Sequence, residues 1–133
     1  MTNFSSILER LSSRAKNALI MAQMASEELK HDHIGTEHLL YGIVSEKSSF
    51  AAEILAKTKL SPEVVKAELI FVNSNNTIST WKPLLSENLK QAIVYGAVVA
   101  SFTVEAFGLD RLRTLQTAEI ENRRTEFRKL CHF

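Results

Sequence analysis

Cysteine, proline and glycine are scarce in this chain, which contains one, two and four of them among 133 residues. The lone cysteine, Cys131, cannot form an internal disulfide, so we expect a reducing, cytoplasmic location. Proline and glycine interrupt helices, and their scarcity therefore permits long ones. Outside Ile70 to Ile78 there is also little of the β-branched alternation that is typical of strands. The sequence predicts an all-α fold.

Long apolar runs are absent too. The longest apolar stretches, such as Ala97 to Ala100, are far shorter than the roughly 18 to 20 residues that a membrane-spanning helix needs. Residues Met1 to Ser6 lack the basic and apolar regions of a secretory signal. The net charge of +1 gives no electrostatic reason to expect nucleic acid or a membrane surface as a partner.

Catalytic motifs are missing as well. No glycine-rich phosphate loop of the Walker type occurs, so we expect no ATP hydrolysis by these residues. A nucleophile needs a base across a pocket and an oxyanion hole, which the adjacent pair Cys131 and His132 does not supply. We therefore expect no enzymatic activity and no cofactor.

The first half of the chain has helical spacing of its apolar residues. From Ser12 to Lys30 their period is near 3.6, which predicts one buried helical face capped by Ser12 or Ser13. Many alanines on that face predict the close approach of a second helix. We expect that second helix to start with Thr36 as its N-cap and to pack tightly at Gly42. The residues of the first face are Ala15, Ala18, Leu19, Ala22, Ala25 and Leu29.

Two further helix starts follow along the chain. Ser48 or Ser49 precedes an apolar segment that is expected to stop around Thr58. The string Ser61-Pro62-Glu63 combines a capping hydroxyl, a proline where no N–H is needed, and an acid at the positive end of the helix dipole. The side chains expected to face the core from that helix are Val64, Val65 and Leu69.

The sequence contains an internal repeat. After a polar connector at residues 73–83, the segment from Ser86 to Phe102 aligns with the segment that starts at Ser12, an offset of 74 residues (86 minus 12). A repeat of this length indicates a duplicated helical unit, and such units commonly pack about a pseudo-twofold axis.

The chain resembles the Clp N-terminal repeat domain of ClpC- and ClpA-type AAA+ unfoldases. The resemblance covers Phe4 to about Phe102 and depends on the order of four motifs. It implies two four-helix repeats, at about 4–72 and 84–133, the second divergent or incomplete. The motifs are Ser13-Arg14-Ala15-Lys16, Ala22-Gln23, the string from His33-Ile34-Gly35-Thr36-Glu37-His38-Leu39-Leu40 to Ile43, and Ala51-Ala52-x-Ile54-Leu55.

The second repeat departs from this pattern after Phe102. Another Gly-Thr-Glu-His-Leu-Leu is expected near residues 108–115 but is missing, and arginine rises from two residues before Phe102 to five after it. Either the last segment is divergent, or the reading frame changes upstream of it. If native, residues 105–127 are expected to form a loosely packed helix with Arg123 on its exposed side. Apolar residues would then lack cover, namely Ile93, Val94, Val98 and Val99.

Four residues suggest a metal site at first sight, because imidazole and carboxylate groups bind zinc. They are His31, His33, Glu37 and His38. Glu37 and His38 are adjacent on a helix and point about 100° apart, and the spacing fits no usual zinc pattern. We interpret the cluster as structural, with His38 hydrogen-bonded to a neighbouring turn, and expect no metal.

The resemblance also implies a candidate binding site. A carboxylate at a helix start can receive a guanidinium group, and nearby hydroxyl and backbone N–H groups can bind an anion. That combination suits phosphoarginine, although Thr36 and Glu37 can equally be simple capping residues. The candidate substrate- or adaptor-binding residues are Arg10, Ser12, Thr36, Glu37 and, in the second repeat, Ser86.

Two functions are compatible with this sequence. The resemblance implies a protein-binding module that recruits adaptors or tagged, unfolded substrates to Clp ATPase and peptidase machinery. The alternative is a stand-alone helical adaptor or structural protein that forms a homodimer through its second repeat.

Overall fold

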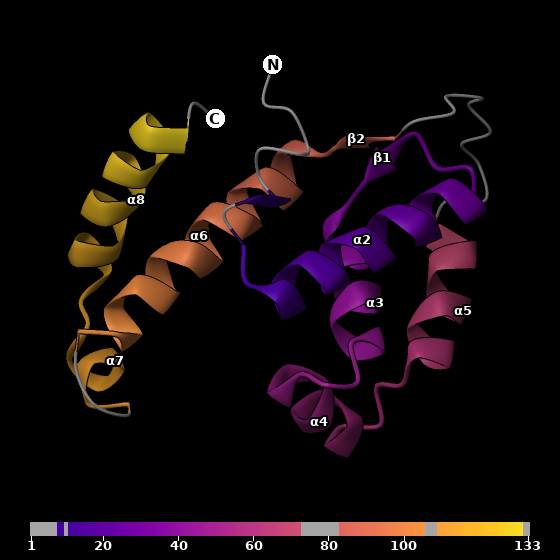
Figure 1. The fold of residues 1–133 in the computed structure, drawn as a ribbon, viewed down its shortest axis with the longest axis horizontal. Coiled ribbons are helices and arrows are strands. Elements are labelled where there is room, and N and C mark those ends of the chain that lie inside the picture. Colours follow the sequence, from indigo (N-terminus) through magenta and orange to yellow (C-terminus); the bar gives the residue numbers. More distant parts are fainter. Residues whose placement is uncertain (1–7, 10, 73–82, 106–108, 132–133) are drawn as a thin grey trace. The chain divides into compact units, whose positions relative to one another are not determined.

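The structure is a computed structural model that describes residues 8–9, 11–72, 83–105 and 109–131. Helices dominate it, which confirms the all-α class (Figure 1). Two compact units make up the chain, one reaching Leu89 and the other starting at Lys90. The first contains α2 (Ser13–Glu28), β1 (His33–Ile34), α3 (Thr36–Ser45), α4 (Phe50–Lys57), α5 (Pro62–Val72), β2 (Leu84–Leu85) and the start of α6 (Glu87–Thr103), and the second contains the rest of α6, α7 (Asp110–Thr114) and α8 (Thr117–Cys131).

Within the described ranges, no helix is long and apolar enough to cross a membrane. The connector predicted at 73–83 lies, apart from Pro83, outside the described residues. The pseudo-twofold arrangement of two repeats stays a prediction.

Serine side chains begin three helices of the first unit, as predicted. Each hydroxyl oxygen accepts a hydrogen bond from the backbone N–H three residues later, which satisfies one of the donors that a helix start leaves unpaired. The distances are 3.4 Å for Ser12 before α2, 3.0 Å for Ser49 before α4 and 3.4 Å for Ser61 before α5.

The start of α3 differs from the prediction. Its N-cap is Gly35 and Thr36 is the first helical residue, so the expected cap at Thr36 is wrong by one position. Gly35 has no side chain with which to cap. Instead, His38 bonds back to the N-cap, as described below.

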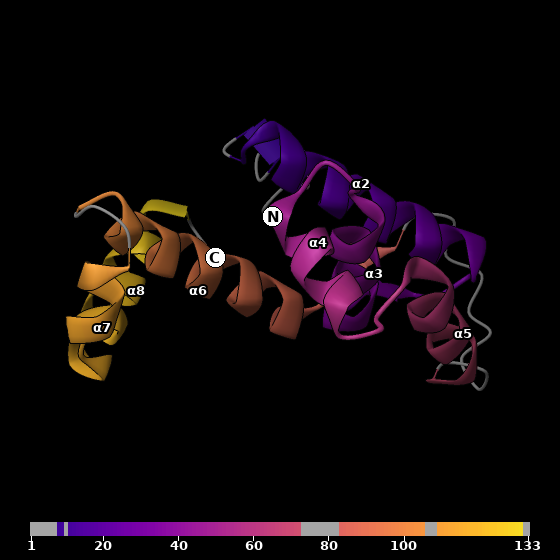
Figure 2. The ribbon, with the colours of Figure 1, turned by 90° about the horizontal axis from the view of Figure 1, so that it is seen from below.

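Gly42 brings α3 against α2 at backbone distance. A Cβ at this position would lie 1.9 Å from the carbonyl oxygen of Ala18 and 3.2 Å from the backbone nitrogen of Ala22. Both alanines are buried, on the face predicted for α2. Figure 2 shows α3 next to α2. The tight packing expected at Gly42 is thus confirmed.

The side chains of α5 that face the core were only partly predicted. Val65 and Leu69 are buried, whereas Val64 is 46% exposed, which contradicts its predicted place in the core. Residues 65 and 69 are one helical turn apart and face α3, while position 64 is rotated toward the edge of that contact.

Lysines occupy two positions where a glycine is usual. Lys30 and Lys59, after the ends of α2 and α4, have φ angles of 56° and 64°. At each site the following N–H bonds to a carbonyl five residues back, from His31 to Ser26 at 2.9 Å and from Leu60 to Leu55 at 3.3 Å. These bonds are typical of a Schellman helix end, which favours glycine because the left-handed conformation strains other residues.

Replacing Lys59 with glycine should therefore stabilise the protein. We expect Lys59→Gly to raise the free energy of unfolding by about 0.5–1 kcal/mol, because relief of strain exceeds the added entropy of the unfolded chain. Lys57→Gly, at the last residue of α4, is the matched control and should cost up to about 1 kcal/mol. Urea unfolding followed by circular dichroism tests both. A loss of stability in Lys59→Gly would contradict the prediction.

A short parallel ladder holds the start of α6 beside the start of α3. His33 pairs with Leu84 and Ile34 with Leu85. The N–H of Ser86 donates to the carbonyl oxygen of Ile34 at 3.0 Å, and Ile34 is 1% exposed. The first residues of the predicted second repeat thus belong to the first compact unit.

The second unit has its own apolar core. Val94, Val98 and Phe102 of α6 are buried, and partly buried side chains of the following segment pack against them. This contradicts the expectation that Val94 and Val98 would lack cover. The expected single helix is instead α7 and α8, separated at Leu115 and Gln116. The covering residues are Leu112, Leu115, Ile120 and Phe127.

Arginine side chains complete this core. The guanidinium carbon of Arg123 lies 3.6 Å from the ring centroid of Phe102, and that of Arg111 lies 5.3 Å from it. Arg123 also donates to Ser101 Oγ at 3.1 Å, and both arginines form ion pairs with Glu105. The predicted exposed position of Arg123 is therefore wrong, because its planar group covers an aromatic face.

Removing this stacked arginine should weaken the second unit. We expect Arg123→Ala to lower the free energy of unfolding by about 1–2 kcal/mol, since it removes a cation–π contact and a charge-assisted pair. Arg124→Ala, which breaks only a surface pair with Glu121, should change it by less than about 0.5 kcal/mol. Hydrogen exchange of the α8 amides measures the effect locally. Equal protection in both variants would contradict it.

Candidate functional site

The first turn of α3 carries an acidic side chain folded over a glycine. The Glu37 side chain is 40% exposed, and Thr36 Oγ1 donates to its Oε2 at 3.5 Å. A Cβ on Gly35 would lie 2.3 Å from both carboxylate oxygens, so the missing side chain leaves room for the carboxylate. The negative charge sits at the positive end of the helix and remains open to solvent.

Two buried histidines lie beneath this turn. His38 Nδ1 accepts a hydrogen bond from the Gly35 N–H at 3.0 Å, and His38 Nε2 lies 2.7 Å from His31 Nδ1. Because Nδ1 of His38 is an acceptor, its Nε2 must carry the proton and donate to His31. The expectation that His38 bonds to a neighbouring turn is confirmed. One neutral tautomer of the pair fits these bonds.

Burial lowers the pKa of His38 and that of His31, and the negative charge of Glu37 opposes this shift without cancelling it. Both imidazoles are therefore neutral at pH 7. The 3.5 Å contact between His38 and Glu37 is consequently not an ion pair at that pH. In the described part of the chain, no lysine or arginine lies within ion-pair distance of Glu37.

The structure separates the histidines that suggested a metal. His31 and His38 bond to each other in the interior, whereas the His33 side chain is 54% exposed and pairs with Asp32 at 3.0 Å. Among the described residues no cluster of three or more histidine, cysteine or acidic side chains could hold a metal ion.

The other candidate residues lie at two further helix starts. The Ser12 hydroxyl caps α2, and the Ser86 hydroxyl caps α6 by accepting the Leu89 N–H at 3.1 Å. Thr36 and Glu37 contact each other, but among the described residues neither bonds to Ser12 or Ser86. Arg10 lies outside the described residues.

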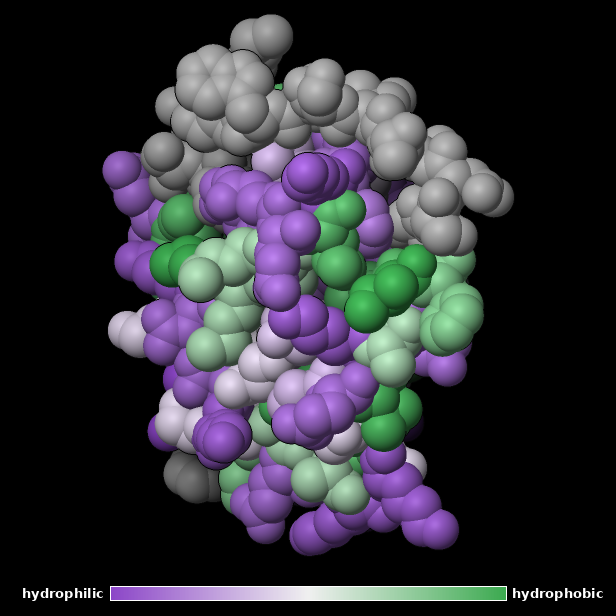
Figure 3. All heavy atoms as spheres, turned by 90° about the vertical axis from the view of Figure 1, so that its right-hand side faces the viewer, coloured by the Kyte–Doolittle hydropathy of each residue, from purple (hydrophilic) through white to green (hydrophobic). Residues whose placement is uncertain are grey.

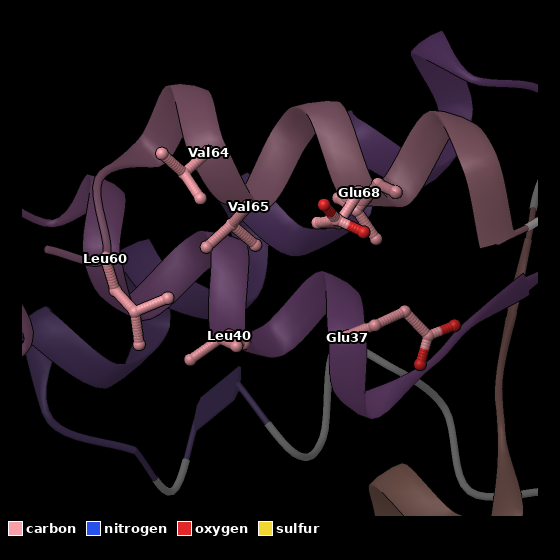
Figure 4. A pocket seen from close by; sticks show the side chains of 7 residues that line it. Glu37, Leu40, Leu60, Val64, Val65 and Glu68 are labelled. Atoms are coloured by element: carbon pink, nitrogen blue, oxygen red, sulfur yellow. The ribbon is translucent and has the colours of Figure 1, made fainter.

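An apolar pocket of about 150 Å³ opens between α3 and α5, and Glu37 stands at its edge. Figure 4 shows Leu60 and Val64 at one end and Glu37 and Glu68 at the other. The lining residues are Glu37, Leu40, Leu60, Val64, Val65, Glu68 and Leu69.

Sequence reasoning assigned Val64, Val65 and Leu69 to the core and overlooked Glu68. The signal was present, because Glu68 follows Val64 by four residues and Val65 by three, which places an acid within the apolar stripe of α5. An acid at such a position indicates a boundary between core and solvent, where a pocket can open.

Comparison with known proteins identifies relatives. Residues 10–125 match the family described as the Clp repeat (R) N-terminal domain. The ClpC ATP-binding subunit of the ATP-dependent Clp protease from Staphylococcus saprophyticus is 40% identical over 60 residues, which is 45% of this chain and 7% of that protein. The ClpA homolog of Porphyra purpurea is 36% identical over 63 residues, 47% of this chain and 8% of that protein.

These matches agree with the motif order read from the sequence and with the helical fold. The family match spans most of the chain, including α7 and most of α8. The chain belongs to the Clp repeat N-terminal domain family.

Proposed function

We propose that this chain recruits adaptor proteins, or tagged and unfolded substrates, to a Clp-type ATP-dependent unfoldase and its peptidase in the cytoplasm. The observation that carries the proposal is the family match over residues 10–125, whose relatives are ATP-binding subunits of Clp proteases. The chain covers 7–8% of those relatives, so ATP hydrolysis is expected elsewhere in the assembly. Recruitment needs only modest affinity per contact, since tethering raises the local concentration of the substrate.

A recruitment assay tests this role directly. The chain is fused in place of the N-terminal domain of the Staphylococcus saprophyticus ClpC subunit, and the degradation of an adaptor-delivered protein by the complete protease is measured. We expect degradation well above that of the ATPase without any N-terminal domain. Equal degradation rates for the fusion and for the ATPase without an N-terminal domain, at unchanged ATPase activity, would contradict the proposal.

Phosphoarginine is the tag that this helix start would suit. Glu37 is exposed and without a cationic partner among the described residues, so it can receive a guanidinium group. The phosphate would need the N–H groups and hydroxyls of a helix start, together with Arg10, which the structure does not describe.

Calorimetric titration tests phosphoarginine binding. We expect a measurable heat of binding at millimolar phosphoarginine. In Glu37→Gln the apparent affinity should fall at least about tenfold, because the guanidinium loses its charged partner. Glu53→Gln, on the exposed side of α4, is the control and should bind like the parent. No heat, or equal heat in Glu37→Gln, would limit Glu37 to a capping role.

The alternative, a homodimer through the second repeat, rested on an uncovered apolar face. Val94 and Val98 are covered by α7 and α8, so no observation now favours that alternative.

A further inference from the structure

We propose that the pocket between α3 and α5 is a docking site for a short segment of a partner protein that carries one large apolar side chain beside an arginine or lysine. The inference rests on the proposed recruiting function and adds the chemistry of the segment that is recognised.

The size of the pocket sets the apolar part of this segment. A volume of about 150 Å³ is that of an apolar cavity able to hold one benzene-sized ring. Apart from the two acids, its walls are aliphatic side chains of α3, α5 and the turn before α5. One phenylalanine or leucine side chain therefore fills it, and two do not.

The charges at one end of the pocket determine the polar part of the bound segment. Glu37 and Glu68 both line the pocket and lie at the same end of it (Figure 4). In the described ranges neither forms an ion pair with a lysine or arginine, whereas the neighbouring Lys66 is paired with Glu28 at 2.9 Å. A cation beside the inserted side chain would approach both acids without displacing a lysine or arginine that is already paired with either.

The site is accessible on the surface of α5. Val64 at the pocket mouth is 46% exposed, and Glu68 is also exposed. Figure 3 views the first unit from the side of α5 and shows hydrophobic side chains interspersed with hydrophilic ones. An apolar side chain with a charged neighbour matches such a surface better than a continuous apolar helix does.

Binding of synthetic peptides tests the proposal. Fluorescein-labelled hexapeptides with a Gly-Ser background carry Phe-Arg, Ser-Arg or Phe-Glu at the centre, and fluorescence anisotropy with the full chain gives their Kd values. We expect Phe-Arg to bind at least about tenfold more tightly than either control, because it alone fills the pocket and meets the acids.

Two pairs of variants locate the binding. Val64→Arg should fill the pocket mouth and pair with Glu68 one turn away, which removes the Phe-Arg preference. Its control is Ile70→Arg on the same helix, 52% exposed and outside the pocket. Glu68→Lys should switch the preference from Phe-Arg toward Phe-Glu, whereas Glu53→Lys on α4 should not.

Each outcome decides the matter. Equal Kd values for the three peptides on the parent chain would overturn the proposal, as would equal effects of Val64→Arg and Ile70→Arg. If Val64→Arg fails to fold, the switch in Glu68→Lys remains the deciding result. Loss of the peptide preference while the fused chain still drives degradation would remove the docking site and leave the recruiting function standing. Selective binding of the Phe-Arg peptide without degradation by the fusion would leave the docking site standing and remove the recruiting function.

Discussion

Gly42→Ala should lower the free energy of unfolding of the first unit by about 3 kcal/mol or more. The added methyl group would lie 1.9 Å from the Ala18 carbonyl oxygen, a backbone atom that no side-chain rotation can move away. The two helices would have to separate, and overpacking of a tight contact costs about 1–3 kcal/mol even where side chains can adjust. Measured against a typical stability of about 5–15 kcal/mol, such a loss is large.

Gly96→Ala provides the matched control for this substitution. Gly96 is also helical, within α6, but a Cβ there would meet no atom within 4 Å. Alanine is the better helix former, so we expect a gain of about 0.5–1 kcal/mol. Thermal unfolding of both variants measures the contrast. A stable Gly42→Ala would show that α2 and α3 do not meet at backbone distance.

His38→Ala should have the second large effect, a loss of about 3 kcal/mol at pH 7.5. It removes a fully buried side chain, and it leaves the Gly35 N–H without the acceptor it has at 3.0 Å. His38→Gln is the informative comparison, because glutamine three residues after an N-cap can accept the same N–H. We expect it to recover about 1 kcal/mol relative to His38→Ala.

The histidine pair also predicts a dependence of stability on pH. The pKa of His31 and the pKa of His38 are lowered on folding, chiefly by burial, while in the unfolded chain both lie near 6.5. Below about pH 6.5 the unfolded state therefore binds more protons, and stability falls as the pH falls, by up to about 1.4 kcal/mol per pH unit for each histidine. Above pH 7 the contribution is constant.

Urea unfolding between pH 7.5 and pH 5 measures this loss. The pKa of Asp32 is lowered by its hydrogen bond with His33, so that carboxylate loses stabilisation only at more acidic pH, outside the chosen range. We expect His38→Gln to reduce the slope, since it removes one titrating group. A slope as steep in His38→Gln as in the parent would assign the pH dependence to other residues.

Local signals predicted the helices well. A serine before an apolar stripe specifies a helix start through one hydroxyl and one N–H. The helix starts could therefore be predicted at Ser61 and, to within one residue, at Ser12 and Ser49. Gly35 was missed because a cap without a side chain leaves no such signal, whereas the adjacent Thr36 carries a hydroxyl of the kind that caps helices.

Contacts between distant residues were not predictable in the same way. The ladder of β1 and β2 involves two residues on each strand, too few for an alternating pattern to appear. In the second unit, arginine was read as a surface residue, whereas the stacking of Arg123 on Phe102 depends on where α8 packs. For the candidate site, Glu37 came from the family motif, but the pocket required α3 and α5 to be placed together.

Helix α6 belongs to both compact units, and this links their unfolding. Its first residues are held in the first unit by the Ser86 hydroxyl and by Leu89, which is fully buried, while Val94 and Val98 form the core of the second. Helices form cooperatively, so fraying at the first turn shortens the segment that carries the second core. Expressing either unit alone would mean cutting inside a helix or keeping all of α6.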